Sequence, residues 1–139
     1  NKGTDMFLNQ LLEISKENFL ILAKHSMSLN GEYKDEEMAI YTSFQHECDK
    51  LGYDPEVTDE ALNNAIISLS GRDLSIRKIV MVELLGILLA DGEICSEERH
   101  LVDQLCTAFD LEGYEIARME RWVQGMNDIV QEGYRIIGA

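Results

Sequence analysis

Two eight-residue segments of this chain are near-copies of each other, and they constrain its fold more than any other feature. Residues 30–37 read NGEYKDEE and residues 91–98 read DGEICSEE, at a constant offset of 61 positions. An apolar segment precedes each copy, and the correspondence continues beyond it, since Phe44 aligns with Leu105. Such a repeat indicates two similar units that bury their apolar faces on each other.

The hydrophobic pattern is helical along almost the whole chain. No run alternates as a half-buried strand would, and Pro55 is the only proline. Thr58 suits the N-cap of one helix and Gly71 its end, while Asp73 or Ser75 can start the next. The pattern predicts six to seven helices, of which the clearest span residues 5–28, 36–51, 59–70, 73–90, 97–109 and 114–136.

These helices predict an all-α single domain over residues 1–139, in two similar three-helix halves of approximately 5–71 and 72–139. Apolar residues make up 45% of the chain, enough for one substantial core. The first helix is expected to bury Phe7, Leu8, Leu11, Leu12, Ile14, Leu22 and Met27. The second is expected to bury Met38, Ile40, Tyr41, Phe44, Cys48 and Leu51.

The last predicted helix has the most regular apolar stripe. Its members lie alternately three and four residues apart: Ile116, Met119, Val123, Met126, Val130, Gly133 or Tyr134, and Ile137. In a chain this short we expect the stripe to face the core rather than a partner. Trp122 lies at the edge of the stripe and is expected to be half-buried.

The net charge excludes some classes of partner. The chain has 26 acidic against 12 basic residues and a net charge of −14. Such a surface repels phosphate backbones and anionic lipid headgroups, so we expect no nucleic-acid partner. It suits metal cations and basic protein surfaces.

Neither a membrane span nor a signal peptide is visible. The longest apolar stretch, Ile79–Ala90, is shorter than the ~20 residues that a span requires, so we expect a buried helix there. Residues 1–5 lack the pattern of a signal sequence. Three cysteines without a C-x-x-C pair favour a reducing compartment, and we expect a cytoplasmic protein.

The repeated turns concentrate carboxylates. Helix capping explains many of them, because Asn-Gly and Asp-Gly end helices, and because Asp35 or Ser96 followed by Glu pairs suits a helix start. Glu32 and Glu93 lie inside the turns, where capping does not require them. Converging carboxylates repel one another, and a hard cation with oxygen ligands relieves that repulsion. Neither copy is an EF-hand, since the twelfth positions are Tyr41 and Val102 instead of Glu.

From roughly residue 14 to 130, the chain resembles the tellurite-resistance protein TerB and TerB-like domains. The resemblance rests on the paired turns and is closer in the second copy, because the first has Asn30 where the second has Asp91. It implies two similar three-helix halves, divalent metal at the acidic turns, and stress-response and membrane-linked assemblies. The implied ligands are Asp91, Glu93, Glu97 and Glu98, with Glu32, Glu36 and Glu37 in the other half.

Other candidate metal-binding and catalytic motifs are weaker or absent. Cys95, His100 and Cys106 lie close in sequence, but their spacing fits no closed zinc module. His46-Glu47 lacks the second histidine of a metalloprotease helix, because Lys50 takes that position. His25 is expected to have a structural role near the end of its helix. No nucleophile elbow, glycine-rich phosphate loop or dinucleotide fingerprint occurs.

Three functions remain open at this point. The first is a non-enzymatic TerB-like module that holds a divalent cation (Ca²⁺, Mg²⁺ or Mn²⁺ in preference to Zn²⁺) and acts through protein partners, membrane-associated ones among them. The second is a metal-independent scaffold whose acidic turns are helix caps. The third is a hydrolase that uses the turn carboxylates through a metal. We expect no enzyme, no cofactor other than the cation and no direct insertion into a membrane.

Overall fold

Six helices make up most of the part of the chain that the computed structural model describes, which comprises residues 7–8, 11–29, 35–90 and 92–138. They are α1 (Glu13–Met27), α2 (Asp35–Glu47), α3 (Asp59–Ser70), α4 (Leu74–Leu88), α5 (Ser96–Ala108) and α6 (Gly113–Ile137). Since these ranges contain no strand, the chain is a single all-α domain, as predicted.

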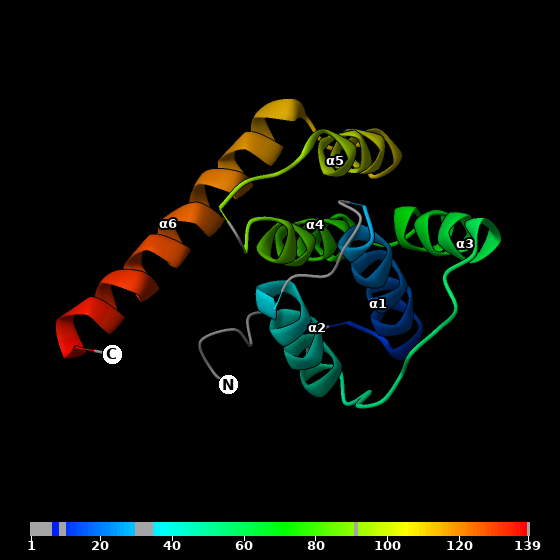
Figure 1. Ribbon diagram of the computed structural model, residues 1–139. Helices are drawn as coiled ribbons and strands as arrows, with labels where there is room; N and C mark the ends of the chain where they lie inside the picture. The colour runs from blue at the N-terminus through cyan, green and yellow to red at the C-terminus, as the bar shows by residue number, and fades with distance from the viewer. Residues whose placement is uncertain (1–6, 9–10, 30–34, 91, 139) are drawn as a thin grey trace.

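The core lies around α1 and α4, which occupy the middle of the molecule (Figure 1). α1 packs most extensively against α3 and also contacts α2 and α4, while α6 packs against α4. The rings of Phe19 on α1 and Phe44 on α2 meet edge to face, with centroids 5.0 Å apart. α4 is buried on most of its circumference, so the apolar segment Ile79–Ala90 is a core helix, as expected. None of the described helices combines the length and the apolarity needed to cross a bilayer.

The caps of α3 and the N-cap of α4 lie where the sequence predicts them. The Thr58 hydroxyl accepts a hydrogen bond from the Ala61 amide at 3.0 Å. Gly71 is the C-cap of α3, and Asp73 is the N-cap of α4. The sequence therefore predicts both ends of α3 and the start of α4 correctly, although the Asp73 side chain makes no cap hydrogen bond.

α1 begins later than predicted, at Glu13 rather than near residue 5. Leu12 and Ile14, expected on its inner face, are exposed. The other residues expected there are buried or partly buried: Phe7, Leu8, Leu11, Leu22 and Met27.

Long-range hydrogen bonds explain this difference. The amide of Phe7 donates to Oε2 of Glu83 on α4 at 2.8 Å, and the amide of Leu8 donates to Oε2 of Glu47 on α2 at 3.1 Å. The two carboxylates, not a preceding turn of helix, therefore satisfy this backbone. Leu8 still reaches the core, although it lies outside the helix.

α2 and α5 end in the same backbone motif. Asp49 and Asp110 follow them with left-handed φ angles of 59° and 55°. After α2, the Lys50 amide donates to the carbonyl oxygen of Gln45 at 2.7 Å; after α5, Leu111 makes the corresponding bond at 2.9 Å. This is the Schellman arrangement, which satisfies the last carbonyls of a helix.

The motif ends α2 at Glu47, four residues before the predicted end. Leu51 lies beyond it and is exposed, contrary to its expected place on the inner face, and Met38 is exposed as well. The remaining residues expected on that face are buried or partly buried: Ile40, Tyr41, Phe44 and Cys48.

The bounds of four helices reproduce the offset of the sequence repeat. Adding 61 to the bounds of α1 gives those of α4, and adding 61 to the bounds of α2 gives those of α5. The third helices differ, because α3 has 12 residues and α6 has 25.

The stripe of α6 is only half covered. Ile116 and Val123 are buried, and α4 is the neighbour that covers this part of the helix. The expectation that the whole stripe faces the core is wrong, because Val130 and Ile137 are exposed. Figure 1 shows the reason, since the C-terminal half of α6 extends past the other helices. Trp122 is 47% exposed and therefore half-buried, as expected.

Candidate functional site

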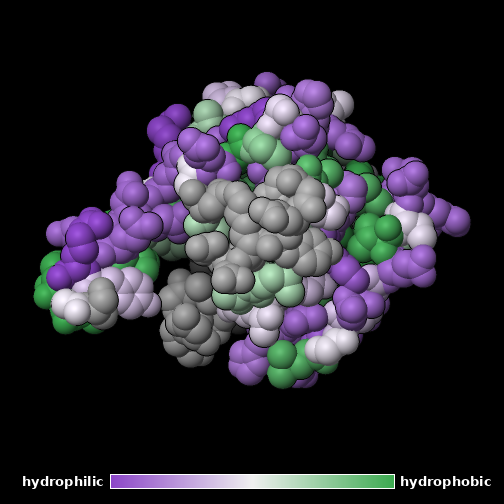
Figure 2. Space-filling model, viewed as in Figure 1, coloured by the Kyte–Doolittle hydropathy of each residue, from purple (hydrophilic) through white to green (hydrophobic). Residues whose placement is uncertain are grey.

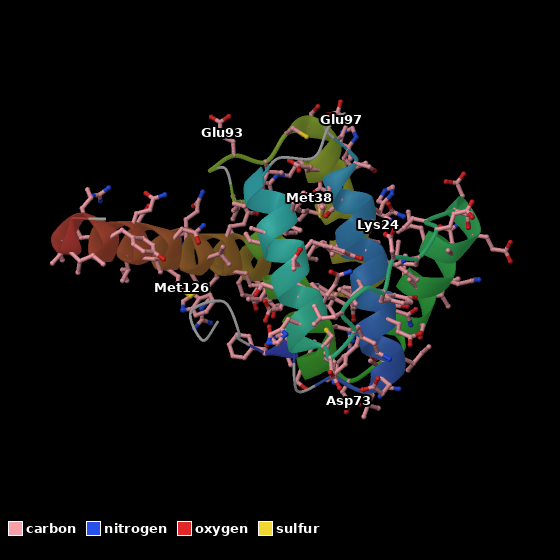
Figure 3. All side chains as sticks on the ribbon, turned by 60° about the horizontal axis from the view of Figure 1, so that its bottom comes forward. Lys24, Met38, Asp73, Glu93, Glu97 and Met126 are labelled. Carbon is pink, nitrogen blue, oxygen red and sulfur yellow. The ribbon has the colours of Figure 1, made fainter. Side chains whose placement is uncertain are left out.

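Two of the predicted ligands face solvent at one end of the molecule. Glu93 lies between α4 and α5, and Glu97 lies in the first turn of α5; both are exposed. Their side chains point away from the helices, as Figure 3 shows. Gly92 precedes them with φ of 95°, a conformation that suits glycine in this turn.

Glu98, by contrast, turns inward and is only 2% exposed. Its Oε1 accepts a hydrogen bond from the amide of Cys95, the N-cap residue of α5, at 2.9 Å. The expectation that Ser96 is the N-cap is wrong by one residue, because Glu98 binds the amide one position earlier. This carboxylate therefore caps a helix, as expected for the scaffold whose acidic turns bind no metal.

Glu97 is held in its ionised form. Hydrogen bonds from its own backbone amide, from the Cys95 thiol and from the Ser96 hydroxyl keep the pKa of Glu97 below its usual value. An anion at this place also interacts favourably with the positive end of the α5 dipole. The turn thus presents a negative charge to solvent at neutral pH.

The first acidic turn is described only in part. Glu32 and Asp91 lie outside the described residues, and Glu36 and Glu37 are placed on α2 by their backbone alone. Within the described ranges, no three His, Cys, Asp or Glu side chains come together to hold a metal ion. The ligand set at the two turns stays a prediction.

All three cysteines are free thiols. Burial raises the pKa of Cys48 to about 12, and it also raises the pKa values of Cys95 and Cys106, so these thiols stay protonated at neutral pH. The Cys106 thiol donates to the carbonyl oxygen of Leu111 at 2.9 Å, while His100 is exposed. Within the ranges that the structure describes, none of these cysteines belongs to a group of three or more candidate metal ligands.

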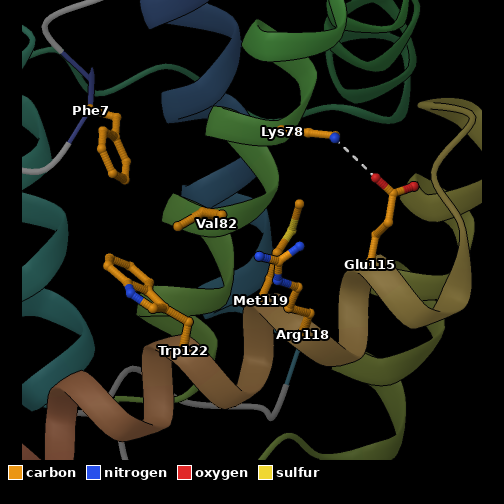
Figure 4. Close-up of a pocket in the computed structure, with 7 residues that line it drawn as sticks. All are labelled: Phe7, Lys78, Val82, Glu115, Arg118, Met119 and Trp122. Carbon is orange, nitrogen blue, oxygen red and sulfur yellow. Dashed lines mark ion pairs between the residues drawn. The ribbon is translucent and has the colours of Figure 1, made fainter.

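A pocket of about 340 Å³ lies between α4 and α6 (Figure 4). Its lining residues are Phe7, Lys78, Val82, Glu115, Arg118, Met119 and Trp122. Sequence reasoning did not find it, because Phe7 comes from a segment far from both helices. The rings of Phe7 and Trp122 are 6.3 Å apart, at the apolar end of the pocket.

The opposite side of the pocket is charged. Lys78 on α4 pairs with Glu115 on α6 at 3.0 Å. Arg118 is exposed and, within the described chain, makes no ion pair. The pocket has the volume and lining of a small ligand or side-chain site, with an apolar end and a cationic edge.

The sequence pattern also did not predict that two acidic residues are buried or partly buried. Glu83 is fully buried on α4, and Glu47 on α2 is partly buried. The sequence showed Glu83 only as an interruption in an apolar stretch. A single acid in the middle of a core helix was the available signal for a buried hydrogen-bond acceptor.

Comparisons with known proteins returned no match, whether to family models, to curated proteins or to solved structures. The TerB-like resemblance therefore rests on the repeated turns alone.

Proposed function

We propose that this chain is a non-enzymatic, TerB-like helical module that acts in a stress response by binding protein partners. The proposal includes two three-helix halves, approximately 5–71 and 72–139, related by a pseudo-two-fold axis. It also places the protein in the cytoplasm, with three free cysteines in support.

The helix bounds support the two halves. α1 and α4, like α2 and α5, have equal lengths and bounds 61 residues apart. The left-handed residues Asp49 and Asp110 differ by the same offset. A shared ancestry of the two units is a simple origin for this agreement.

One observation carries the binding function: the projecting half of α6 exposes an apolar strip. We define the α6 strip as the apolar residues of this half: Met126, Ile129, Val130, Tyr134, Ile136 and Ile137. Ile129 and Ile137 are 73% and 72% exposed. Contiguous apolar surface of this kind is typical of a protein-interaction site.

Retention of a partner from a lysate of the source cells tests the proposal. We expect the immobilised chain to retain a protein that a variant carrying Ile129→Ser and Ile137→Ser loses. Ile67→Ser is the matched control, because Ile67 lies on α3 and is 69% exposed. Equal loss in the control, or retention by the double variant, would contradict binding through the α6 strip.

A divalent cation at the turn before α5 is a second candidate function. Its support is the exposure of Glu93 and Glu97 within five residues and the ionised state of Glu97. Oxygen ligands of this kind suit Ca²⁺, Mg²⁺ or Mn²⁺ rather than Zn²⁺. The inward Glu98 supports the alternative, a metal-independent scaffold with acidic caps.

Calorimetric titration with the four cations at physiological ionic strength separates these alternatives. If a site exists, Glu93→Gln abolishes saturable binding, whereas Glu112→Gln, an exposed acid at the start of α6, leaves it intact. Equal losses in both variants would indicate only a diffuse ion atmosphere around a chain of charge −14.

A further inference from the structure

The α6 strip continues an interface that already exists within the molecule. Ile116 and Val123 pack in the core where α4 covers α6, and the same three-and-four spacing runs on through Val130 to Ile137. Figure 2 shows hydrophobic residues at the far end of α6 beside a hydrophilic upper edge. A surface with helical spacing that extends a helix–helix contact fits another helix.

The charge of α6 permits a second copy of this chain to approach it. The helix carries four acids, Glu115, Glu120, Asp128 and Glu132, and three arginines, so its net charge is −1 in a chain of −14. Because the C-terminal half projects (Figure 1), two copies can meet there while their acidic bodies stay apart.

The area is adequate for such a contact. From the exposed fractions of its apolar side chains, the α6 strip presents on the order of 600 Å², approaching the ~800 Å² per partner of a standard interface. It also lies at the upper end of the apolar patches found on monomers.

Two glycines on the same face complement its isoleucines in size. Gly125 and Gly133 lie within α6 at four residues before and after Ile129, and Ile137 follows four residues later, so all four share one face. Glycine is among the least favourable residues for a helix interior. A Cβ at either glycine would have no other atom of the described chain within 4 Å, so nothing there requires it. Along this face, each glycine therefore leaves a gap that is followed one turn later by a projecting isoleucine side chain.

We propose that α6 pairs with α6 of a second copy in an antiparallel dimer centred on residue 131. In this register, Ile129 of each copy faces Gly133 of the other, and Ile137 faces Gly125. Met126 meets Ile136 in the same way. The arrangement is self-complementary, as a two-fold interface must be. The inference rests on the proposed function, because it names the partner of the α6 strip.

Sedimentation velocity on the purified chain tests the pairing. We expect a dimer at about 100 µM, consistent with a micromolar Kd for a contact of this size. Ile129→Ala removes the knob, and Gly133→Ile sets two isoleucines against each other, so each variant raises the dimer Kd at least tenfold. A mixture of the two variants restores the dimer, because each isoleucine then faces a small residue.

Gly113→Ile is the matched control for the glycine substitution. Gly113 is the first residue of α6, where a Cβ also meets open space, and it lies far from the α6 strip. This variant leaves the dimer Kd unchanged. Circular dichroism confirms that all variants keep their helix content.

Three results would overturn the pairing. They are a wild-type chain that stays monomeric at about 100 µM, a dimer that both single variants preserve, and a mixture that fails to restore it. A monomer that still captures another protein through the α6 strip overturns only the second copy and leaves the proposed function standing. A dimer that captures no protein and binds no cation counts against the proposed function alone.

Discussion

The ends of α2 and α5 have the same backbone and opposite chemistry. Lys50 follows the left-handed Asp49. Its ammonium group forms ion pairs with Glu13 at 2.8 Å and Glu17 at 3.1 Å, and these pairs link the end of α2 to α1. At the corresponding place after α5, Leu111 is buried in the core. A surface ion-pair group thus occupies one position and an apolar contact occupies the other.

This difference separates what the turn requires from what each half adds. The Schellman hydrogen bonds need only a residue that tolerates left-handed φ, and both halves supply an aspartate. The next residue is free to vary, and its environment determines whether it is charged or apolar. The ion pairs raise the pKa of Lys50 to about 12, which reflects its two carboxylate partners.

Leu111→Ala tests the apolar side of this comparison and has the largest expected effect. The substitution leaves a cavity at a buried position, so we expect the free energy of unfolding to fall by about 2–4 kcal/mol. Urea denaturation followed by circular dichroism measures it. Leu51→Ala, at an exposed leucine, is the control and changes stability by less than about 0.5 kcal/mol. Similar effects of the two substitutions would show that Leu111 is not a core residue.

Asp49→Ala and Asp110→Ala test the shared backbone. Alanine adopts left-handed φ less readily than aspartate, so each variant should lose roughly 0.5–1 kcal/mol of stability, and by the same amount. Asp→Gly at either position should give a gain of similar size. Unequal losses in thermal denaturation would mean that the two helix ends are not equivalent.

Lys50→Met tests the polar side and should cost less than Leu111→Ala. Exposed ion pairs contribute little and are screened by salt, so the loss should shrink as the ionic strength rises. The cost of Leu111→Ala should not decrease with salt. Matched urea curves in low and high salt check both statements, and a salt-independent loss for Lys50→Met would argue for packing instead.

The smallest effect is expected from His25 on α1, which gives stability a pH dependence that the corresponding position of α4 cannot give. Burial lowers the pKa of His25 below 6.5, against the opposing charge of Asp59, and the corresponding residue of α4 is Gly86. The folded chain therefore binds this proton less readily than the unfolded chain. Stability from His25 is present above pH 6.5 and falls as the pH drops toward the folded pKa. Comparing stability between pH 7.5 and 5 should show a smaller loss for His25→Gln than for wild type.

Local chemistry made the helix count, α3 and the ends of α4 and α5 predictable within a few residues. Thr58 and Gly71 mark the two ends of α3 in the sequence, and they are its N-cap and C-cap in the structure. The helix-cap reading of the second acidic turn was also visible in the order Ser-Glu-Glu, and Glu98 follows it. These features depend on contacts within a few positions along the chain.

The start of α1, the pocket and the projecting half of α6 depend on residues far apart. Leu12 is spaced from the apolar residues that follow it as in a helix, but α1 begins only at Glu13. The amides of Phe7 and Leu8 instead bind carboxylates on α4 and α2. The stripe of α6 has the same spacing along its whole length, so periodicity alone does not tell where α4 ceases to cover it. Whether an apolar stripe is core or surface depends on the length of its neighbour.

The two carboxylates that hold Phe7 and Leu8 also impose an order on folding. Their acceptors lie 76 and 39 residues away along the chain, on different helices, so the Phe7 bond requires α4 to be in place and the Leu8 bond requires α2. These amides should become protected from hydrogen exchange only when the tertiary structure is complete, later than amides within α4. Two adjacent backbone positions thus report on the assembly of the whole domain.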